Sequence, residues 1–222
     1  MSVASHLKIR LDEYDARIRT FVPDYEVQLD VTAKALRLLD IPRPTMIDLG
    51  IGTGALAARC LEIHPGARII GIDADEGMLR SARERLLQHS QLELVRGDFL
   101  QLPLPTCDAI VATLALHHVP TPGEKQDFYG KCRAALRSPG LLVTADCYPA
   151  REARLAAIHR QAWLAHLQRS YSPEEAEGYL EAWADEDYHF PLEDELMWLG
   201  EAGFATEVLW RRDGFAVVAG MA

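Results

Sequence analysis

Short apolar runs alternate with helical segments along the first two thirds of the chain. The apolar runs are Thr45–Leu49, Ala67–Ile72, Leu92–Arg96, Cys107–Ala112 and Leu141–Asp146. The stretches 54–64, 76–88 and 123–137 lie between them and have the periodicity of helices. Strands separated by helices of about a dozen residues form βαβ units with right-handed crossovers. The pattern therefore predicts an α/β domain with a parallel sheet.

A helical segment precedes the first strand. Residues 6–40 have a helical texture that is broken at Val22–Asp24 and ends before Ile41–Pro44. Four apolar residues of this segment recur at helical spacing: Leu29, Ala33, Leu36 and Leu39. We therefore expect residues 1–42 to form an N-terminal helical cap on a core that spans residues 43–149.

Residues 150–190 contain helical segments and no strand-like run. The segments are interrupted at 170–173, where Ser172 and Pro173 supply an N-cap and a first-turn proline and Glu175 supplies the acid of a capping box. An excursion of this kind between two strands of a sheet is typical of a helical lid insertion.

The last segment, residues 191–222, combines a helix with a hairpin. The helix is expected at Leu192–Ala202, and the strands Thr206–Trp210 and Phe215–Ala219 flank the hairpin signal Arg211–Gly214. The chain is thus predicted to be one domain, residues 1–222. Its fold is α/β, with a Rossmann-like, seven-stranded, mostly parallel sheet that ends in an antiparallel hairpin.

Composition and charge narrow the class of protein. The 222 residues are 49% hydrophobic and 25% charged, as in an ordinary globular protein. The formal net charge of -10 disfavours a nucleic-acid partner, because such binding relies on Lys and Arg. No apolar run resembles a signal peptide or a membrane span, so we expect a cytoplasmic protein without a membrane partner.

The four cysteines are well separated and form no C-x-x-C pair. They are Cys60, Cys107, Cys132 and Cys147. Most of them sit in or beside apolar runs, which is typical of buried free thiols in a reducing compartment. We therefore predict no zinc site, and no metal site elsewhere.

A glycine-rich loop follows the first predicted strand. It reads Asp48-Leu-Gly50-Ile51-Gly52-Thr-Gly, and glycines at such a turn let the backbone approach a ligand closely. Gly50, Gly52 and Ala55 also satisfy the G-x-G-x-x-G/A dinucleotide pattern, so an NAD-dependent enzyme has to be considered.

Carboxylates at the ends of further strands argue against the NAD-dependent alternative. Asp73 ends the second strand, where its two oxygens suit two adjacent ribose hydroxyls, and Asp98 follows the third strand. With the glycine loop, the segments G-I-D-A-D, R-G-D-F and C-D-A-I-V-A-T-L-A-L-H-H-V resemble the class I S-adenosylmethionine-dependent methyltransferase superfamily. Each segment alone is a weak signal, but their order at successive strand ends is specific.

That resemblance implies roles for the residues of a cofactor-binding core. Gly50 and Gly52, in the loop with Asp48 and Ile51, would face the amino-acid part of S-adenosyl-L-methionine. Asp73, with Met78 following it, would hold the ribose. Asp98 would accept from the adenine amino group, with Ala74 and Phe99 flanking the ring. Asp73 and Asp98 also have a simpler interpretation, as helix caps or turn residues.

The chain further resembles the branch that contains carboxy-S-adenosylmethionine synthase, over nearly its whole length. The likeness rests on Tyr14-Asp-Ala-Arg-Ile, on Phe21-Val-Pro-Asp-Tyr25 and on Leu199–Phe204 leading into Leu209-Trp210. It implies that Tyr25 contacts the cofactor from the cap and that Thr113 replaces an asparagine of the synthase.

One departure from that branch bears on the cofactor. The synthase family holds the extra carboxylate with an arginine at the position where this chain has Trp198. Without a cation there the carboxylated cofactor loses its charge-assisted partner. We therefore interpret the cofactor as ordinary S-adenosyl-L-methionine.

His117 and His118 are the candidate catalytic residues. They follow the fourth strand, close to where a methyl group would be presented, and histidine titrates near neutrality. The alternative is that the pair only orders the loop. Weaker candidates are Tyr14, Asp146 and Tyr148.

The insertion adds aromatic and acidic side chains. Its aromatic residues Trp163, Tyr171, Tyr179, Trp183 and Tyr188 either line an apolar acceptor pocket or pack the added helices onto the domain. From Ser170 to Trp210 there are twelve acidic residues and no Lys or Arg. We interpret this run as a solvated helix face, with steering of an amine acceptor as the sharper alternative.

These observations predict a methyltransferase that acts on a small-molecule acceptor, either an amine or an apolar compound. The alternatives are an enzyme of the carboxy-S-adenosylmethionine synthase type that modifies a cofactor or tRNA, and a non-catalytic protein that binds S-adenosyl-L-methionine. An NAD-dependent oxidoreductase is poorly supported. The terminal hairpin and the exposed insertion leave room for a homodimer.

Overall fold

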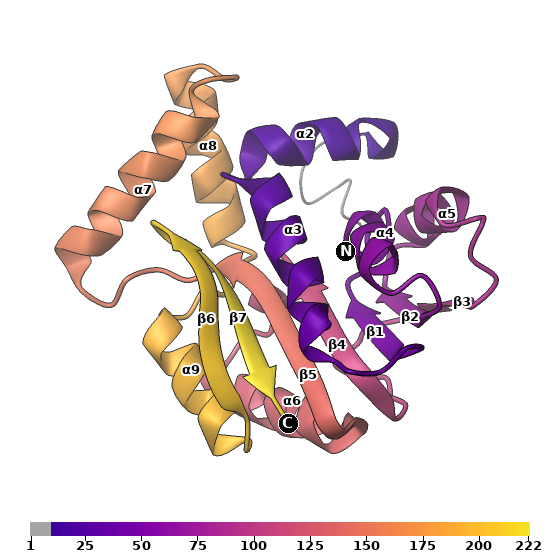
Figure 1. The fold of residues 1–222 in the computed structure, drawn as a ribbon. Coiled ribbons are helices and arrows are strands. Elements are labelled where there is room, and N and C mark those ends of the chain that lie inside the picture. The colour runs from indigo at the N-terminus through magenta and orange to yellow at the C-terminus, as the bar shows by residue number, and fades with distance from the viewer. Residues whose placement is uncertain (1–9) are drawn as a thin grey trace.

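The computed structural model describes residues 10–222 (Figure 1), so the part of the helical prediction that falls on residues 6–9 lies outside the described residues. A seven-stranded sheet has the order β3-β2-β1-β4-β5-β7-β6. Its strands are β1 (Thr45–Leu49), β2 (Arg68–Asp73), β3 (Leu92–Arg96), β4 (Cys107–Thr113), β5 (Leu136–Cys147), β6 (Ala205–Arg212) and β7 (Phe215–Met221). Strands β1 to β5 pair in parallel, and β7 lies antiparallel between β5 and β6. The predicted α/β, Rossmann-like fold with its C-terminal hairpin is confirmed.

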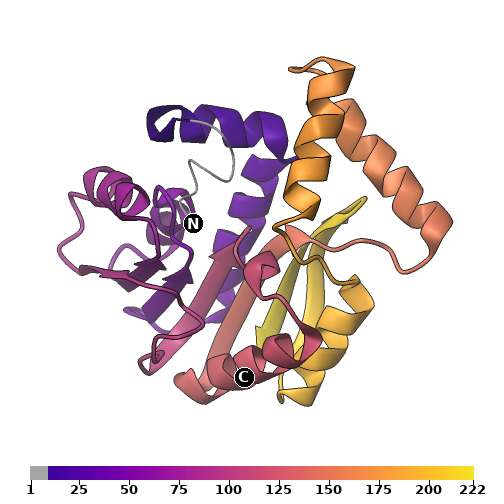
Figure 2. The same cartoon turned by 180° about the vertical axis from the view of Figure 1, so that it is seen from behind.

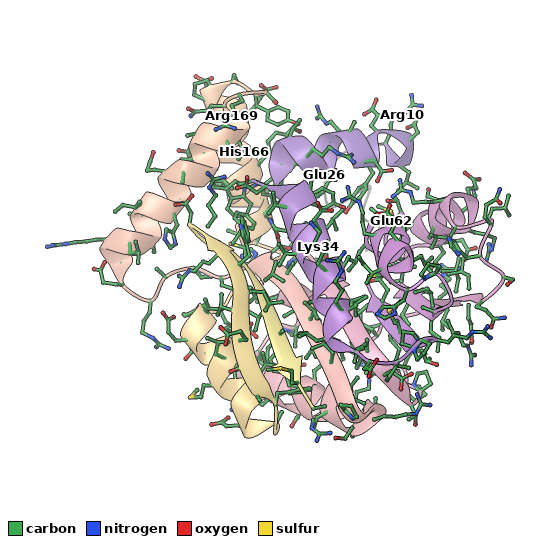
Figure 3. All side chains as sticks on the ribbon, viewed as in Figure 1. Arg10, Glu26, Lys34, Glu62, His166 and Arg169 are labelled. Carbon is green, nitrogen blue, oxygen red and sulfur yellow. The ribbon has the colours of Figure 1, made fainter. Side chains whose placement is uncertain are left out.

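Helices cover both faces of the sheet and the carboxyl ends of its strands (Figure 1). They are α2 (Tyr14–Phe21), α3 (Tyr25–Ala35), α4 (Ala55–Ile63), α5 (Glu76–Arg85), α6 (Pro122–Ala135), α7 (Ala153–Leu167), α8 (Pro173–Ala184) and α9 (Leu192–Glu201). One buried core joins α3, α4 and α5 to the sheet, and a second joins α6 and α9 to the opposite face (Figures 1 and 2). Charged residues of α3 such as Glu26 and Lys34 lie on its outer side (Figure 3). This division follows the sequence, because buried parallel strands carry apolar residues on both faces.

The element boundaries differ most from the predicted ones at two places. Strand β5 begins at Leu136 rather than Leu141, because Leu136 pairs with Cys107 across an irregularity in the ladder. Helix α5 ends at Arg85 rather than Gln88, because Leu86 leaves the helical conformation and starts a turn closed by His89. Residues 137–140 of β5 are polar, proline or glycine, and Leu86 and Leu87 continue the apolar pattern past the end of α5, so hydrophobic periodicity locates neither boundary.

The N-terminal helix α2 and the insertion, residues 150–190, meet above the carboxyl ends of the strands (Figure 1). The indole Nε1–H of Trp163 donates to the Phe21 carbonyl at 2.7 Å, and the Phe21 ring lies 5.0 to 5.6 Å from the rings of Tyr171, Tyr179 and Trp183. The predicted capping box of Ser172 and Glu175 starts α8. Among the described residues no helix is long and apolar enough to cross a membrane.

Candidate active site

A cavity of about 550 Å³ opens at the carboxyl ends of the parallel strands, beneath α2 and α8. A volume of this size is ordinary for a small-molecule or cofactor site. The predicted site residues that line it are Gly50, Gly52, Asp73, Ala74, Met78, Asp98, Phe99, Thr113, His117 and His118. The structure therefore brings the glycine loop, the strand-end carboxylates and both candidate histidines to one space.

The glycine loop has a backbone that other residues adopt only with strain. Gly50 and Gly52 have φ of +65° and +56°, in the left-handed region. The Gly50 N–H donates to the Ile72 carbonyl at 2.8 Å, which fixes the loop to the end of β2. A Cβ at Gly50 would lie 2.8 Å from the Ala115 Cβ, whereas at Gly52 the nearest atom would be 3.9 Å away. The loop thus leaves open space next to Gly52.

Asp73 and Asp98 each accept backbone hydrogen bonds at one end of the cavity. Asp73 is 7% exposed, and its carboxylate accepts the N–H groups of Gly52 at 2.9 Å and Asp75 at 2.8 Å. Burial raises its pKa, and these backbone bonds oppose the rise. Asp98 accepts the Leu100 N–H at 2.9 Å, so the turn-residue interpretation applies to it. A carboxylate accepts about four hydrogen bonds, so both side chains retain acceptor capacity toward a ligand.

Three predicted cofactor residues line a second, smaller cavity rather than the large one. Tyr25, Asp48 and Ile51 surround a space of about 30 Å³ together with Gly50, Gly52 and Thr113. Tyr25 is 7% exposed because it packs into the core, and it lines only the smaller cavity.

Two polar atoms of the smaller cavity are buried without a hydrogen-bond partner among the described residues. They are Asp48 Oδ2 and Thr113 Oγ1. Burial, together with the negative charge of Asp73, raises the pKa of Asp48 well above its usual range. A cationic or donor group placed here would satisfy both atoms.

Histidines and carboxylates gather at the other end of the large cavity. The Asp146 Oδ1, at the end of β5, lies 2.7 Å from His117 Nδ1, and the Asp146 Oδ2 accepts the His117 backbone N–H at 3.2 Å. Asp187 Oδ1 lies 3.6 Å from His117 Nε2 and 3.7 Å from His118 Nδ1. His189 adds a third ring, 5.4 Å from that of His117.

Mutual contact sets the protonation of this group. Although burial alone would raise it, the neighbouring His117 holds the pKa of Asp146 well below its usual range. Burial alone would lower the pKa of His117, but Asp146 outweighs burial and raises it. Burial, with the charge of His117, lowers the pKa of His189 to about 4, so His189 is neutral at pH 7. An ionised Asp146 requires that His117 Nδ1 carry the proton, which leaves Nε2 directed toward Asp187.

Asp187 and His189 were not identified from the sequence as site residues. Both lie in the connection between α8 and α9, where the Tyr188 N–H donates to the His117 carbonyl at 2.8 Å. The connection reaches the site because it folds back over η3 (Leu116–His118). This placement is a tertiary contact, so no sequence motif marks the two residues. Of the aromatic residues of the insertion, Trp163, Trp183 and Tyr188 line the cavity, whereas Tyr171 and Tyr179 pack against Phe21.

The acidic run is mostly a solvated surface, as predicted, but not throughout. Asp185, Glu186 and Asp187 line the cavity, and Glu195 is 2% exposed and paired with Lys125 at 2.8 Å. None of the described residues that line the large cavity is Lys or Arg. Trp198 does not line the cavity either; it packs in the core beneath α9 with its ring 5.2 Å from that of Phe190.

Comparisons with known proteins agree with this geometry. Residues 46–140 match the family model described as a methyltransferase domain. An uncharacterized methyltransferase from Geobacillus sp. (strain WCH70) is 34% identical over 138 residues, which cover 61% of this chain and 60% of the relative. A carboxy-S-adenosyl-L-methionine synthase from Nautilia profundicola is 24% identical over 206 residues, 91% of this chain and 88% of the synthase.

Among solved structures, the pyocyanin biosynthetic protein PhzM superposes with a TM-score of 0.67 at 22% identity. The alignment covers 100% of this chain and 62% of PhzM, so this chain spans about three fifths of the length of PhzM and of the Geobacillus relative. At that identity the likeness concerns the fold. The matched domain, the strand order and the glycine loop at the end of β1 agree: residues 46–140 match a methyltransferase domain, and the chain resembles the class I S-adenosylmethionine-dependent methyltransferases in fold.

Proposed function

We propose that this protein transfers a methyl group from S-adenosyl-L-methionine to a small-molecule acceptor. The observation that carries the proposal is the continuity of one cavity, from Gly52 and Asp73 at one end to His117 and Asp146 at the other. Methyl transfer is an in-line displacement, so a cofactor site that opens directly onto an acceptor site is the arrangement it requires.

The residues at the glycine loop fit the cofactor. The unpartnered Asp48 Oδ2 and Thr113 Oγ1 suit the ammonium of its amino-acid part, and Gly52 leaves space for backbone to approach it. The spare acceptor capacity of Asp73 suits the ribose hydroxyls, and Asp98 suits the adenine amino group beside Phe99. When bound, the cofactor supplies a methyl group activated by its sulfonium.

The chain's own residues bind the acceptor and move its proton. The Nδ1–H of His117 donates a hydrogen bond to Asp146. In the neutral form of the ring, Nε2 therefore has a free lone pair at the acceptor end of the cavity. A hydroxyl or amine placed there can pass its proton to that nitrogen as it is methylated. Phe21, Trp163 and Trp183 close the cavity above and keep water from the reacting group.

Charge in the cavity bears on both the acceptor and the cofactor. Asp146, Asp185, Glu186 and Asp187 line the acceptor end, and none of its described lining residues is Lys or Arg. A carboxylated acceptor would meet like charge there, so an amine or an uncharged apolar acceptor is favoured. The same lack of a cation disfavours carboxy-S-adenosylmethionine as the cofactor. Trp198 lies outside the cavity, so its side chain does not decide which cofactor binds.

The segments take roles that follow from their positions. Residues 1–42 act as the cap, 43–149 as the cofactor-binding core, 150–190 as the lid over the acceptor and 191–222 as the support of the sheet edge. The hydrogen bond from Trp163 to Phe21 joins cap and lid, so the two would open together to admit ligands. A homodimer through the lid or the hairpin is part of the same proposal, and sedimentation of the purified protein measures it.

Calorimetric titration tests the cofactor. Binding of S-adenosyl-L-methionine in the micromolar range corresponds to about -8 kcal/mol. We expect Asp73→Ala to weaken it and Asp40→Ala, an exposed change in the connection before β1, to leave it unchanged. Binding of NADH without binding of S-adenosyl-L-methionine would overturn the assignment, and tighter binding of the carboxylated cofactor would favour the synthase activity instead.

Turnover tests the reaction. The protein is incubated with S-adenosyl-L-methionine and matched sets of amine, neutral and carboxylated aromatic compounds, and S-adenosylhomocysteine is measured. We expect product with an amine or neutral acceptor. Cofactor binding without product for any acceptor would support the non-catalytic alternative.

A further inference from the structure

Three donor atoms at the acceptor end of the cavity come from side chains that favour transition metals. We propose that His117 Nε2, His118 Nδ1 and Asp187 Oδ1 form a binding site for a divalent transition-metal ion of the zinc type. Asp187 Oδ1 lies 3.6 Å from His117 Nε2 and 3.7 Å from His118 Nδ1, and each of the three residues offers a ligand atom within 4.8 Å of those of the other two. Imidazole nitrogens with one carboxylate oxygen are a common ligand set for zinc.

The spacing is close to that of an occupied tetrahedral shell. Zinc–nitrogen and zinc–oxygen distances of about 2.0–2.2 Å place neighbouring ligand atoms about 3.3–3.6 Å apart. The two distances to Asp187 Oδ1 therefore need to shorten by only a few tenths of an ångström. The centroids of the His117 and His118 rings lie 4.3 Å apart, and their planes are inclined at 72°.

Asp146 orients His117 in the way that outer carboxylates orient metal-binding histidines. The short contact of His117 Nδ1 with Asp146 Oδ1, at 2.7 Å, fixes the ring and directs Nε2 toward Asp187. Such a carboxylate–histidine pair raises the basicity of the ligand nitrogen and fixes its tautomer. Asp146 acts here as a positioning residue.

A second set of donors, His117, Asp146 and His189, is less suitable. It would use His117 Nδ1 and Asp146 Oδ1, but their separation of 2.7 Å is a hydrogen-bond distance and is short for two ligands of one tetrahedral ion. Asp146 Oδ1 also accepts the Cys147 N–H at 2.9 Å. The observations therefore favour the set that contains Asp187 and His118.

The surroundings leave the site accessible and negatively charged. His118 has 47% of its side chain exposed, whereas His117 and Asp187 have 10% and 9%. All three line the large cavity, so a three-ligand ion would keep an open position toward the acceptor, as catalytic zinc sites do. Asp146, Asp185 and Glu186 line the same end of the cavity and attract a dication.

Metal binding does not depend on the proposed methyl transfer. An ion on His117 Nε2 occupies the lone pair that the metal-free protein offers to the acceptor proton. The loaded protein would then present a Lewis acid to an acceptor oxygen or nitrogen at the same place. The proposal is consequently tested by metal binding itself, and cofactor binding measured in parallel shows whether the proposed function fails separately.

The experiment titrates ZnCl2 and then CoCl2 alone into the untagged, chelator-treated protein. We expect one equivalent of zinc to bind with micromolar or tighter affinity, and cobalt to give the visible absorption of a four- or five-coordinate site. His118→Ala, a change at a half-exposed side chain, and Asp187→Asn are each expected to lower zinc affinity about tenfold or more. His89→Ala removes a histidine from the surface turn after α5 and should change nothing.

Two outcomes would overturn the site. The first is a wild-type protein that binds no zinc in this range. The second is that His118→Ala and Asp187→Asn bind zinc as tightly as the control His89→Ala, which would mean that zinc is coordinated adventitiously elsewhere. Circular dichroism of each variant verifies that a lost affinity is not a lost fold.

Discussion

Asp146 holds His117 by both of its carboxylate oxygens. Oδ1 lies 2.7 Å from the ring Nδ1, and Oδ2 accepts the backbone N–H of the same residue at 3.2 Å. Oδ1 also accepts the Cys147 N–H at 2.9 Å. The end of β5 therefore positions the histidine that follows β4, and the orientation of His117 depends on a neighbouring strand more than on its own loop.

Asp146→Asn tests this dependence. An amide has one acceptor oxygen, so if that oxygen serves Nδ1–H and the Cys147 N–H, the amide NH2 faces the backbone N–H of His117. We expect turnover with a productive acceptor to fall about 10–100-fold, as for other partners that orient a functional histidine. Binding of S-adenosyl-L-methionine, measured by calorimetry, should change little. Equal losses of binding and turnover would indicate a general distortion of the cavity instead.

Gly50 and Gly52 form a matched pair for the loop. Both have positive φ, so alanine at either should cost about 1–2 kcal/mol of folding stability. At Gly50 the new Cβ would also lie 2.8 Å from the Ala115 Cβ, and this overpacking should add about 1–3 kcal/mol. Urea unfolding measures the difference.

Gly52→Ala serves as the internal control for that clash, since its Cβ would meet only the Gly50 carbonyl at 3.9 Å. Gly52→Ala should lower affinity for S-adenosyl-L-methionine more than it lowers stability, because the alanine side chain would occupy the space beside the loop. Equal losses of stability in the two variants would show that Ala115 yields to the added methyl group.

The sequence predicted the fold well because periodicity and strand-end residues carry most of the information. Five apolar runs marked β1 to β5, and Asp73 and Asp98 fell at strand ends that a parallel sheet brings to one edge. Asp187 could not be predicted as part of the site. Its position depends on how the α8–α9 connection folds back onto η3, which is a tertiary effect without a local pattern.

Trp198 shows a second limit. The family likeness suggested a role for that position, but burial decides whether a side chain reaches the cavity. Trp198 packs in the core on the inner face of α9, whereas Tyr25 lines the smaller cavity beside Asp48 and Thr113. Sequence similarity indicates which residues align, whereas the packing of helices determines which of them a ligand can touch.

We expect the buried Asp48 to lower the stability of the fold and to strengthen cofactor binding. Burial raises its pKa, so the folded protein binds this proton more tightly than the unfolded chain, whose aspartate pKa is about 3.9. Stability therefore falls as pH rises above about 4, and the loss is complete above the folded pKa. Asp48→Asn removes this penalty. We expect a higher Tm than that of the wild type at pH 7, a difference that shrinks toward pH 4, and weaker binding of S-adenosyl-L-methionine.

Asp40→Asn is the control for Asp48→Asn, because Asp40 is exposed and should show neither effect. Thermal unfolding at several pH values, with and without cofactor, gives both readings. A variant that is less stable than the wild type at pH 7 would show that ionised Asp48 stabilises the apo protein, contrary to the expectation from its burial.

The buried pair of Lys125 and Glu195 tests how much a buried ion pair contributes to the stability of the fold. Both side chains are 2% exposed, Lys125 Nζ lies 2.8 Å from Glu195 Oε1, and the Tyr129 hydroxyl donates to the other carboxylate oxygen. Lys125→Met leaves a buried carboxylate without its cation, which should cost about 3–5 kcal/mol of unfolding free energy. The double change Lys125→Met with Glu195→Gln removes both charges and should recover most of that loss, because the amide can still pair with Tyr129.

Arg160→Met provides the comparison, since it breaks the exposed pair of Arg160 with Glu177 and should change stability little. Urea unfolding of these variants and of the single variant Glu195→Gln completes the double-mutant cycle and gives the coupling between Lys125 and Glu195. If Lys125→Met proved no more harmful than Arg160→Met, Glu195 would have to be neutral in the folded protein. Burial raises the pKa of Glu195, so the comparison also tells which of burial and the ion pair determines its charge near pH 7.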